Sequence, residues 1–381
     1  MCPESLEAEA TIGVLLAWKL HNRIQHVCAQ LCICNSFLTT GNRSFPVASA
    51  PGLRYTRLMA ENLGLAGIPG QRTALGPLFA QARDYFDQAK ASATRKSYQR
   101  DWRHFSGWCQ QHGRLSLPAE PETVALYLTD QAQTLKVATL AKRVAALSQA
   151  HQFAGHVSPT HDILVRTVLA GIRRSKSTAQ SRKRPILTED LRRMVSFLPD
   201  TLAGRRDRAL LLLGFAGGFR RSELVGLNQN DLRLTHDGLI IQVRRSKTDQ
   251  EGQGREVGIP FGSTPATCPV RATRAWLADL EPGDTEPLFR PVNRHGQMSK
   301  RRVTDRVVAL VVKRAARAAG LDSADLAGHS LRSGLATSAA AAGVPERAIM
   351  AQTGHRSLTT LRKYIRSGSL FLENAAAKVG L

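Results

Sequence analysis

Acidic side chains are scarce in this chain of 381 residues, which carries 53 Lys and Arg against 30 Asp and Glu. The formal net charge of +23 repels itself, so the composition predicts a polyanionic partner such as DNA, RNA or an anionic membrane surface. Long apolar runs are also missing, and none approaches the roughly eighteen residues that cross a bilayer. The acidic start Met1-Cys2-Pro3-Glu4 lacks the cationic region of a signal peptide. We therefore expect a cytoplasmic protein.

Cysteine is rare too, with six in the chain. Cys109 and Cys268 are isolated and are predicted to be reduced thiols. Three cysteines near the N-terminus lie close to two histidines: Cys28, Cys32, Cys34, His21 and His26. Their spacing fits no structural zinc pattern, so we predict no metal site. Residues 1–72 are interpreted as an N-terminal extension, for which disorder and an internal start at Met59 both stay open.

Hydrophobic residues make up 43% of the chain, which is enough for two domains with real cores. The first domain is predicted over residues 75–174 as a bundle of helices. One helix carries the apolar stripe Tyr98, Trp102, Phe105, Trp108 and Cys109 at helical spacing. Turn-forming Pro and Gly residues then separate further helices over 122–134, 137–153 and 160–173.

Residues 175–185 are basic and polar without an apolar stripe, so they are interpreted as a linker that follows DNA phosphates. The second domain is predicted over residues 186–381, beginning with a helix at Leu187-Thr188-Glu189-Asp190. It should be mainly helical with one short antiparallel sheet. Strand-like residues 239–243 and 255–260 flank a polar, Gly-rich stretch, which predicts a hairpin with Lys247 at its mouth.

The second domain also carries residues whose order and spacing suit cleavage of a phosphodiester by a tyrosine. Arg220 and Glu223 are three residues apart, so the carboxylate can orient the guanidinium while Arg221 points elsewhere. His329 and Arg332 have the same spacing at the start of a predicted helix. Both of these side chains can therefore reach one phosphate.

Tyr364 follows His355 by nine residues, on a helix that Ser357 can cap. Taken alone, His355 would be interpreted as an ordinary turn histidine, but the joint spacing to Tyr364 favours a functional interpretation. For Lys247, the position at the mouth of the hairpin favours a functional role, and the alternative is one more solvated cation.

The chemistry of the reaction asks for these residue types. An attacked phosphodiester spreads negative charge over its nonbridging oxygens, which two arginines can bind without a metal. Attack by a tyrosine stores the bond energy in an aryl phosphate, so a DNA hydroxyl can reverse the step without ATP. The leaving 5′ oxygen needs a proton, and Lys247 is the predicted general acid. We therefore expect no cofactor.

These residues resemble the motifs of the tyrosine recombinase (phage integrase) family, and the likeness covers roughly residues 75 to 381. The family's Gly-x-Arg-x-Ser-Glu-Leu box, hairpin Lys, His-x-Leu-Arg, Gly-His and final Tyr all have matches. The resemblance implies Tyr364 as nucleophile, Arg220 and Arg332 as phosphate clamps, Lys247 and His329 as proton-transfer groups, His355 as a phosphate hydrogen bonder and Glu223 as a supporting carboxylate.

The resemblance also implies the fold and the partners. The first domain should be the family's helical, SAM-like core-binding domain, and the second its mainly α catalytic domain, as in type IB topoisomerases. The partner would be double-stranded DNA, on which a homo-tetramer forms when the C-terminal helix docks on a neighbouring protomer. An accessory DNA-bending protein is compatible with this scheme, and a membrane partner is not expected.

Cations outside the catalytic set are candidates for DNA contact. They lie in the predicted bundle, linker and hairpin: Arg95, Lys96, Arg100, Arg173, Arg174, Lys176, Arg182, Lys183, Arg184, Arg244 and Arg245.

Site-specific recombination is the leading function, and two alternatives stay open. A type IB topoisomerase would relax DNA by the same chemistry without needing a defined pair of sites. A catalytically silent DNA-binding protein would have lost active-site residues, whereas all six positions here hold competent ones.

Overall fold

The computed structural model describes residues 76–176, 183–247, 249, 251–283, 286–365 and 379. The predicted N-terminal extension, Arg182 in the predicted linker and, apart from residue 379, the segment after residue 365 for which a C-terminal helix is predicted lie outside the described residues. Within the described part of the chain, no helix is long and apolar enough to cross a membrane.

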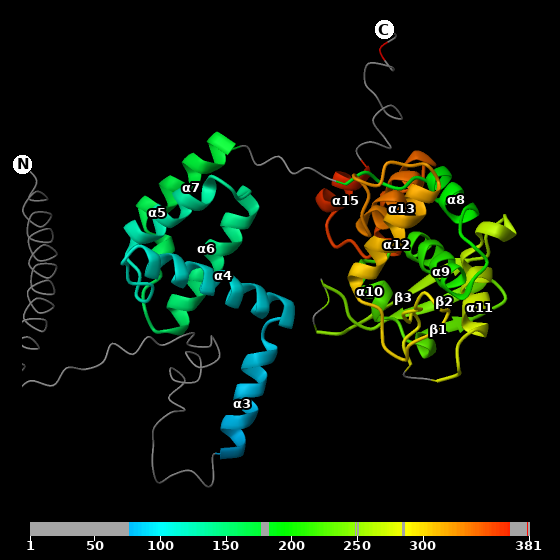
Figure 1. The fold of residues 1–381 in the computed structure, drawn as a ribbon, viewed down its shortest axis with the longest axis horizontal. Coiled ribbons are helices and arrows are strands. Elements are labelled where there is room, and N and C mark those ends of the chain that lie inside the picture. The colour runs from blue at the N-terminus through cyan, green and yellow to red at the C-terminus, as the bar shows by residue number, and fades with distance from the viewer. Residues whose placement is uncertain are drawn as a thin grey trace, which may run out of the picture. The chain divides into compact units, whose positions relative to one another are not determined.

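Two compact units make up the described chain (Figure 1). The first gathers residues 76–83, Lys96–Asp130 and Ala141–Arg166, and the second gathers Asp84–Arg95, Gln131–Leu140 and the described residues from Thr167 onwards. The division into domains at 75–174, 175–185 and 186–381 stays a prediction.

The N-terminal elements are helical, as expected. Their bounds are α3 Gly76–Gln88, α4 Ser92–Gln111, α5 Pro121–Ala132, α6 Val137–Phe153, the 3-10 turn η1 Pro159–His161 and α7 Ile163–Lys176. Helix α7 begins later than predicted because Pro159–His161 forms a separate turn, after which the Asp162 carboxylate accepts from the backbone N–H of Leu164 at 2.8 Å. It also ends later, and the Lys176 ammonium donates to the backbone carbonyl of Ala132.

The predicted stripe of α4 forms the core of the first unit. Trp102, Phe105, Trp108 and Cys109 are buried, whereas Tyr98 is half-buried. Burial raises the pKa of the Cys109 thiol to about 11. The ring of Tyr127 on α5 packs edge-on against Phe105, with centroids 5.0 Å apart. This unit is therefore held together by aromatic side chains from α4 and α5.

The C-terminal elements form a mainly helical unit with one small sheet. Their bounds are α8 Thr188–Ser196, α9 Leu202–Ala216, α10 Arg221–Gly226, η2 Gln229–Asp231, β1 Leu232–Leu234, β2 Gly238–Val243, β3 Arg255–Pro260, η3 Pro265–Thr267, α11 Pro269–Ala278, α12 Asp305–Ala318, α13 His329–Ala341, α14 Glu346–Thr353 and α15 Leu358–Ile365.

The sheet has three antiparallel strands in the order β1, β2, β3. Ile241 on β2 pairs with Leu232 on one side and Val257 on the other. The buried residues of β3 alternate with exposed ones, as expected for a strand with one face on the core. The predicted hairpin is thus present, and its connecting loop carries Lys247.

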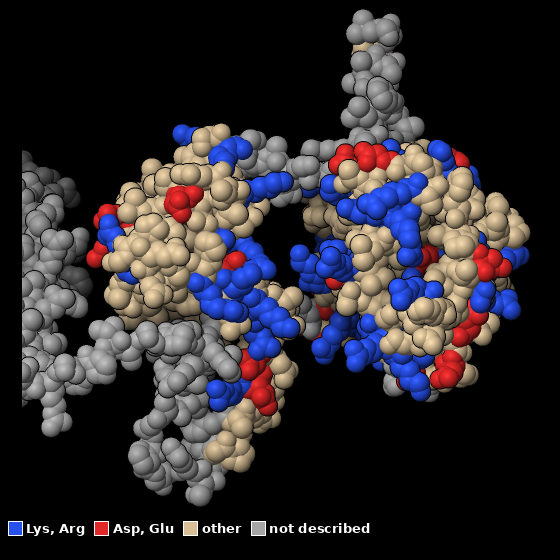
Figure 2. Space-filling model, in the orientation of Figure 1, with Lys and Arg blue, Asp and Glu red and all other residues tan. Residues whose placement is uncertain are grey.

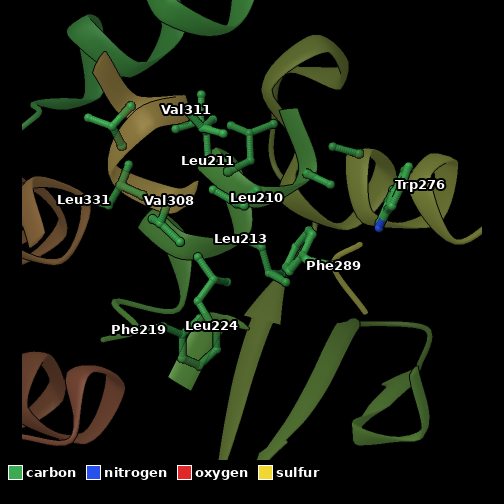
Figure 3. Packing of buried hydrophobic residues seen from close by; sticks show 14 of the residues in the cluster. Leu210, Leu211, Leu213, Phe219, Leu224, Trp276, Phe289, Val308, Val311 and Leu331 are labelled. Carbon is green, nitrogen blue, oxygen red and sulfur yellow. The ribbon is translucent and has the colours of Figure 1, made fainter. Parts of the chain in front are cut away.

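Helix α9 lies at the centre of the main hydrophobic core (Figure 3). Its residues Leu210, Leu211 and Leu213 are fully buried. Leu224, Val308 and Leu331 bring α10, α12 and α13 into the same cluster. Burying leucine and valine side chains contributes roughly 1.5–3 kcal/mol each, so this core fixes the start of α10 relative to the start of α13.

A second, smaller cluster joins helices α13, α14 and α15. Ala336 on α13, Ile349 on α14, and Leu361 and Ile365 on α15 are buried together. This cluster is separate from the main core, and it holds the helix that carries Tyr364.

Candidate active site

Five of the six predicted catalytic residues meet where the starts of α10 and α13 approach the turn between α14 and α15. Arg220 precedes α10, and His329 and Arg332 occupy the first turn of α13. His355 lies in the turn after α14, and Tyr364 is on α15. The sixth residue, Lys247, is exposed on the loop between β2 and β3.

Glu223 orients Arg220 as the spacing predicts. The Arg220 Nη1 donates to Glu223 Oε1 at 2.5 Å, and the Arg220 backbone N–H donates to Oε2 at 3.0 Å. The Glu223 side chain is 0% exposed and that of Arg220 is 16% exposed. The guanidinium is therefore held at the edge of the core with one side directed to solvent.

Arg332 is buried with an unsatisfied donor. Its Nη1 donates to the carbonyls of Gly218 and Thr353, whereas Nη2 has no hydrogen-bond partner within the described residues. Burial, followed by the nearby charge of Arg220, lowers the pKa of Arg332 to about 10, so the side chain stays cationic at neutral pH. A buried donor of this kind is costly unless an acceptor arrives, and a phosphate oxygen would supply one.

The tautomer of His355 follows from its neighbours. The Thr353 hydroxyl donates to the Ile349 carbonyl at 2.6 Å, and the same oxygen lies 2.7 Å from His355 Nδ1. Because the hydroxyl proton is already used, Nδ1–H must be the donor to Thr353. Burial first, and then Arg332 and Arg220, lower the pKa of His355 to about 3. The neutral ring therefore leaves Nε2 as an acceptor.

Tyr364 is paired with a neutral histidine. Its hydroxyl lies 2.7 Å from His329 Nε2, and its ring contacts those of His329 and His355 with centroids 5.5 Å and 5.1 Å away. Burial is the main cause that lowers the pKa of His329, with further contributions from Arg332 and other cations that include Lys247. A neutral imidazole can accept the phenolic proton.

The hairpin loop that carries Lys247 is held by Asp249. The two carboxylate oxygens of Asp249 accept from the backbone N–H groups of Gly254 at 2.8 Å and Gln253 at 3.1 Å. These bonds lower the pKa of Asp249, that of Gly254 most. The Lys247 side chain is exposed, and it lies near enough to His329 for its positive charge to lower the pKa of that histidine.

Two arginines near the site were not predicted to act there. Arg255, the first residue of β3, donates to Glu223 and to the Gln352 carbonyl. Arg221 does point away from Glu223, with Nη2 3.8 Å from an Asp305 oxygen, but it is also one of the cations that lower the pKa of His329. Nothing in the local sequence marks either residue, because both roles depend on contacts between distant segments.

The candidates for DNA contact divide into two groups. Lys96, Arg173, Arg174 and Arg245 are exposed. The others make intramolecular contacts, although all of them except Arg95 are exposed too: Arg95 with Asp87, Arg100 with Asp101, Lys176 with backbone carbonyls, Lys183 with Asp325, Arg184 with Asp190 and Arg244 with Asp231. On the face shown in Figure 2, Lys and Arg gather over α4 in the first unit, and over α12 and the β2–β3 loop in the second.

Metal ligation finds no support in the described part of the chain, where no group of three or more His, Cys, Asp or Glu side chains is placed to hold an ion. The cysteine cluster at residues 28–34 lies outside the described residues.

Comparison with known proteins identifies the family. The Phage integrase family model matches residues 185–369. Over 304 residues the chain is 43% identical to the integrase/recombinase xerD homolog of Selenomonas ruminantium, an alignment that covers 78% of this chain and 88% of that protein. The chain belongs to the phage integrase family.

Further relatives agree with that assignment. The recombinase cre of Escherichia phage P1 is 27% identical over 284 residues, which cover 70% of this chain and 81% of that protein. Among solved structures, XerH site-specific recombinase bound to a palindromic difH substrate has a TM-score of 0.56 at 18% identity and covers 85% of this chain and 94% of its own. A lambda integrase dimer bound to a COC′ core site has a TM-score of 0.52 at 17% identity, with 76% and 93% covered.

These likenesses confirm the predicted fold class, mainly helical with a small antiparallel sheet. They also confirm the predicted function class. This protein is a tyrosine-type site-specific recombinase that breaks and rejoins DNA.

Proposed function

We propose that Tyr364 is the nucleophile and that it forms a 3′-phosphotyrosine link with one DNA strand. The contact that carries this proposal is the 2.7 Å hydrogen bond between the Tyr364 hydroxyl and His329 Nε2. It supports the proposal because the phenol already has a proton acceptor, and the buried Arg332 nearby has an unused donor. The proposed nucleophile, base and phosphate-binding group would therefore be together before DNA arrives.

Each step of the proposed reaction uses one of these residues. His329 takes the phenolic proton, and the Tyr364 oxygen attacks the phosphorus. The bond from phosphorus to the 5′ oxygen breaks, and that oxygen takes a proton from Lys247 to leave as a free 5′-hydroxyl. A 5′-hydroxyl from another DNA end then attacks the phosphotyrosine, and the two proton transfers run in reverse.

Arg220 and Arg332 would bind the nonbridging oxygens of the phosphate. Arg332 offers the unpartnered Nη2, and Arg220 offers the part of its guanidinium that Glu223 leaves open. Removing a donor that acts on developing charge costs about 10²- to 10³-fold in rate. Because the guanidinium groups supply the positive charge and the phosphotyrosine stores the bond energy, the proposed reaction proceeds in EDTA and without ATP.

His355 changes its role when the phosphate binds. In the free protein its neutral Nε2 cannot donate, because Nδ1 carries the proton, and burial together with the surrounding arginines lowers the pKa to about 3. A phosphate anion would offset those arginine charges and raise the pKa of His355. The ring could then take up a proton on Nε2 and donate a hydrogen bond to a phosphate oxygen.

The test of the nucleophile uses nicked duplexes made from the DNA that flanks the gene. Attack near a nick releases a short strand and traps the protein on DNA, which a denaturing gel reveals. We expect an adduct with the natural chain and none with Tyr364→Phe, although both bind the duplex. Recombination that survives in Tyr364→Phe would overturn the assignment.

We further propose that four protomers assemble on two DNA sites, joined through the C-terminal segment. Four strands are cut in two pairs during site-specific exchange, which requires four nucleophiles, and the related lambda integrase structure holds a dimer on a core site. Deleting residues 369–381 should abolish tetrameric complexes while single-site binding remains. Intact tetramers after the deletion would show that this segment does not join the protomers.

A further inference from the structure

We propose that Arg255 is a positioning residue for the phosphate clamp: it holds the Glu223 carboxylate and the His355 turn in the geometry that Arg220 needs. The inference rests on the proposed role of Arg220. Arg255 lies on β3, and none of the predicted catalytic residues comes from that strand.

One carboxylate is shared by two arginines. Glu223 Oε1 accepts from Arg220 Nη1, whereas Oε2 accepts from the Arg220 backbone N–H at 3.0 Å and from Arg255 Nη2 at 3.5 Å. The Glu223 side chain is 0% exposed, so both of its oxygens depend on these donors. Losing Arg255 leaves Oε2 with one uncharged donor, and a buried carboxylate in that state is expected to shift.

The same guanidinium also supports the turn that carries His355. Arg255 Nη1 donates to the Gln352 carbonyl at 3.1 Å. Gly354 has a φ of +68°, and a Cβ there would lie 2.8 Å from Arg255 Nε and 3.1 Å from Cζ. Arg255 therefore packs on the space that this glycine leaves open. Arg220 Nη2 approaches the carbonyl of the same glycine at 3.5 Å.

Arg255 is mostly buried, so its charge is not simply solvated at the surface. Its side chain is 22% exposed, and its Nε is buried without a partner within the described residues. Burial, opposed by the attraction of Glu223, lowers the pKa of Arg255. Arg255 is in turn one of the charges that lower the pKa of both His355 and Arg332.

Arg255 also begins the strand that leaves the Lys247 loop, so an effect through Lys247 is the rival explanation. Double-mutant cycles on the rate of adduct formation with a nicked duplex distinguish the two. Arg255→Gln should slow cleavage by roughly 10- to 100-fold, the range seen when a partner that orients a metal ligand is removed. Arg233→Gln is the control, because it removes an exposed cation from the same sheet.

The proposal predicts that the effect of Arg255→Gln on the cleavage rate depends on Arg220 and not on Lys247. In Arg220→Ala, adding Arg255→Gln should slow cleavage by less than about threefold, because the group that it positions is already gone. In Lys247→Ala the same change should cost its full factor. Full additivity with Arg220→Ala, or loss of the effect only with Lys247→Ala, would overturn the proposal. If Arg255→Gln does not fold, Arg255→Lys replaces it, because lysine keeps the charge but cannot bond both Glu223 and the turn.

Failure of this inference is distinguishable from failure of the proposed function. If the natural chain forms no adduct on any duplex, the catalytic roles and the inference fall together. If the natural chain cleaves and Arg255→Gln cleaves equally fast, only the role of Arg255 is wrong.

Discussion

Burial, together with the arginines around them, keeps the two histidines of the proposed active site neutral. Arg332 and Arg220 contribute to the lowered pKa of both His329 and His355. A neutral His329 can accept the Tyr364 proton near physiological pH, and an unprotonated His355 leaves the cationic cluster open to a phosphate. The arginines that we propose to bind the phosphate thus also help to keep the histidines beside it unprotonated.

Lys247 provides the first prediction at the scale of single residues. Lys247→Ala should slow cleavage of an ordinary duplex by about 10²- to 10⁴-fold, because the leaving 5′ oxygen then lacks its proton. A duplex with sulfur in place of that oxygen needs no general acid, since a thiolate leaves unprotonated. Most of the lost rate should return with this substrate. Equal defects on both duplexes would show that Lys247 is not the acid, and Arg245→Gln, at an exposed position two residues earlier, serves as control.

His355 gives a prediction for stability. The unfolded chain binds a proton on this histidine below its ordinary pKa of 6.5, whereas the folded chain does so only near pH 3. Stability should therefore fall as the pH drops from 6.5 toward 3, by at most about 1.4 kcal/mol per pH unit from this group. Urea unfolding at several pH values should show a shallower pH dependence for His355→Gln. Identical slopes would contradict the lowered pKa.

The proposed catalytic positions could be predicted from local sequence because each motif lies within a few residues of chain. The Arg220 and Glu223 pair is closed within one turn, and the structure contains that contact. Arg255 could not be found in this way, because its partners Glu223 and Gln352 are brought to it only by tertiary folding.

At the scale of elements, the position of Tyr364 depends on how α15 is docked. Leu361 and Ile365 pack into the small cluster with α13 and α14. The Thr337 hydroxyl donates to the Tyr364 carbonyl at 2.9 Å, and Arg362 makes a bidentate ion pair with Glu346 at 2.9 Å and 3.0 Å. These contacts fix the helix without involving the main core.

Leu361→Ala should therefore undock α15 while the rest of the unit stays folded. A buried Leu→Ala change costs about 2–5 kcal/mol, which a cluster of four buried residues cannot absorb. We expect adduct formation to drop by more than tenfold and limited proteolysis to begin within residues 358–365. The unfolding of the main core should move little. Leu358→Ala is the matched control because Leu358 is 45% exposed on the same helix, and equal losses in both variants would contradict this account.

The sequence predicted best those elements that have a clear hydrophobic periodicity or are bounded by turn-forming Pro and Gly residues. Strands β2 and β3 match the predicted stretches within one residue, and α6 matches its predicted bounds. The missed elements are short: β1 has three residues and is defined by its pairing with β2. The end of α7 was placed too early, because a run of arginine and lysine has no apolar period, yet it continues the helix to Lys176.

For the whole molecule, the excess of positive charge sets how DNA binding responds to salt. A chain with a formal charge of +23 should release many counterions on binding, and its affinity should fall steeply between low and physiological salt. That steepness reports the number of phosphates neutralised, not the sequence recognised.

Arg100 on α4 tests which cations take part. Its side chain is 72% exposed on the helix over which Lys and Arg gather in Figure 2. Arg100→Gln should lower the slope of log affinity against log salt by about one unit. Arg114→Gln removes an equal charge from a side chain that is only 38% exposed, compared with 72% for Arg100, and it should leave the slope unchanged. An unchanged slope for Arg100→Gln would remove this residue from the DNA interface.

The composition predicted the polyanionic partner at this scale, since charge balance requires no knowledge of the fold. It could not indicate which cations face DNA. Lys183, Arg184 and Arg244 looked equivalent to Lys96 in sequence, but the structure pairs them with carboxylates.

The most direct measurement is chemical identification of the residue that carries the DNA. The adduct formed on a nicked duplex is digested with a protease and a nuclease, and the modified peptide is sequenced by mass spectrometry. The account predicts a nucleotide joined through its 3′ phosphate to Tyr364, with a free 5′-hydroxyl on the released strand. A nucleotide on any other residue, or a link to the 5′ phosphate, would contradict it.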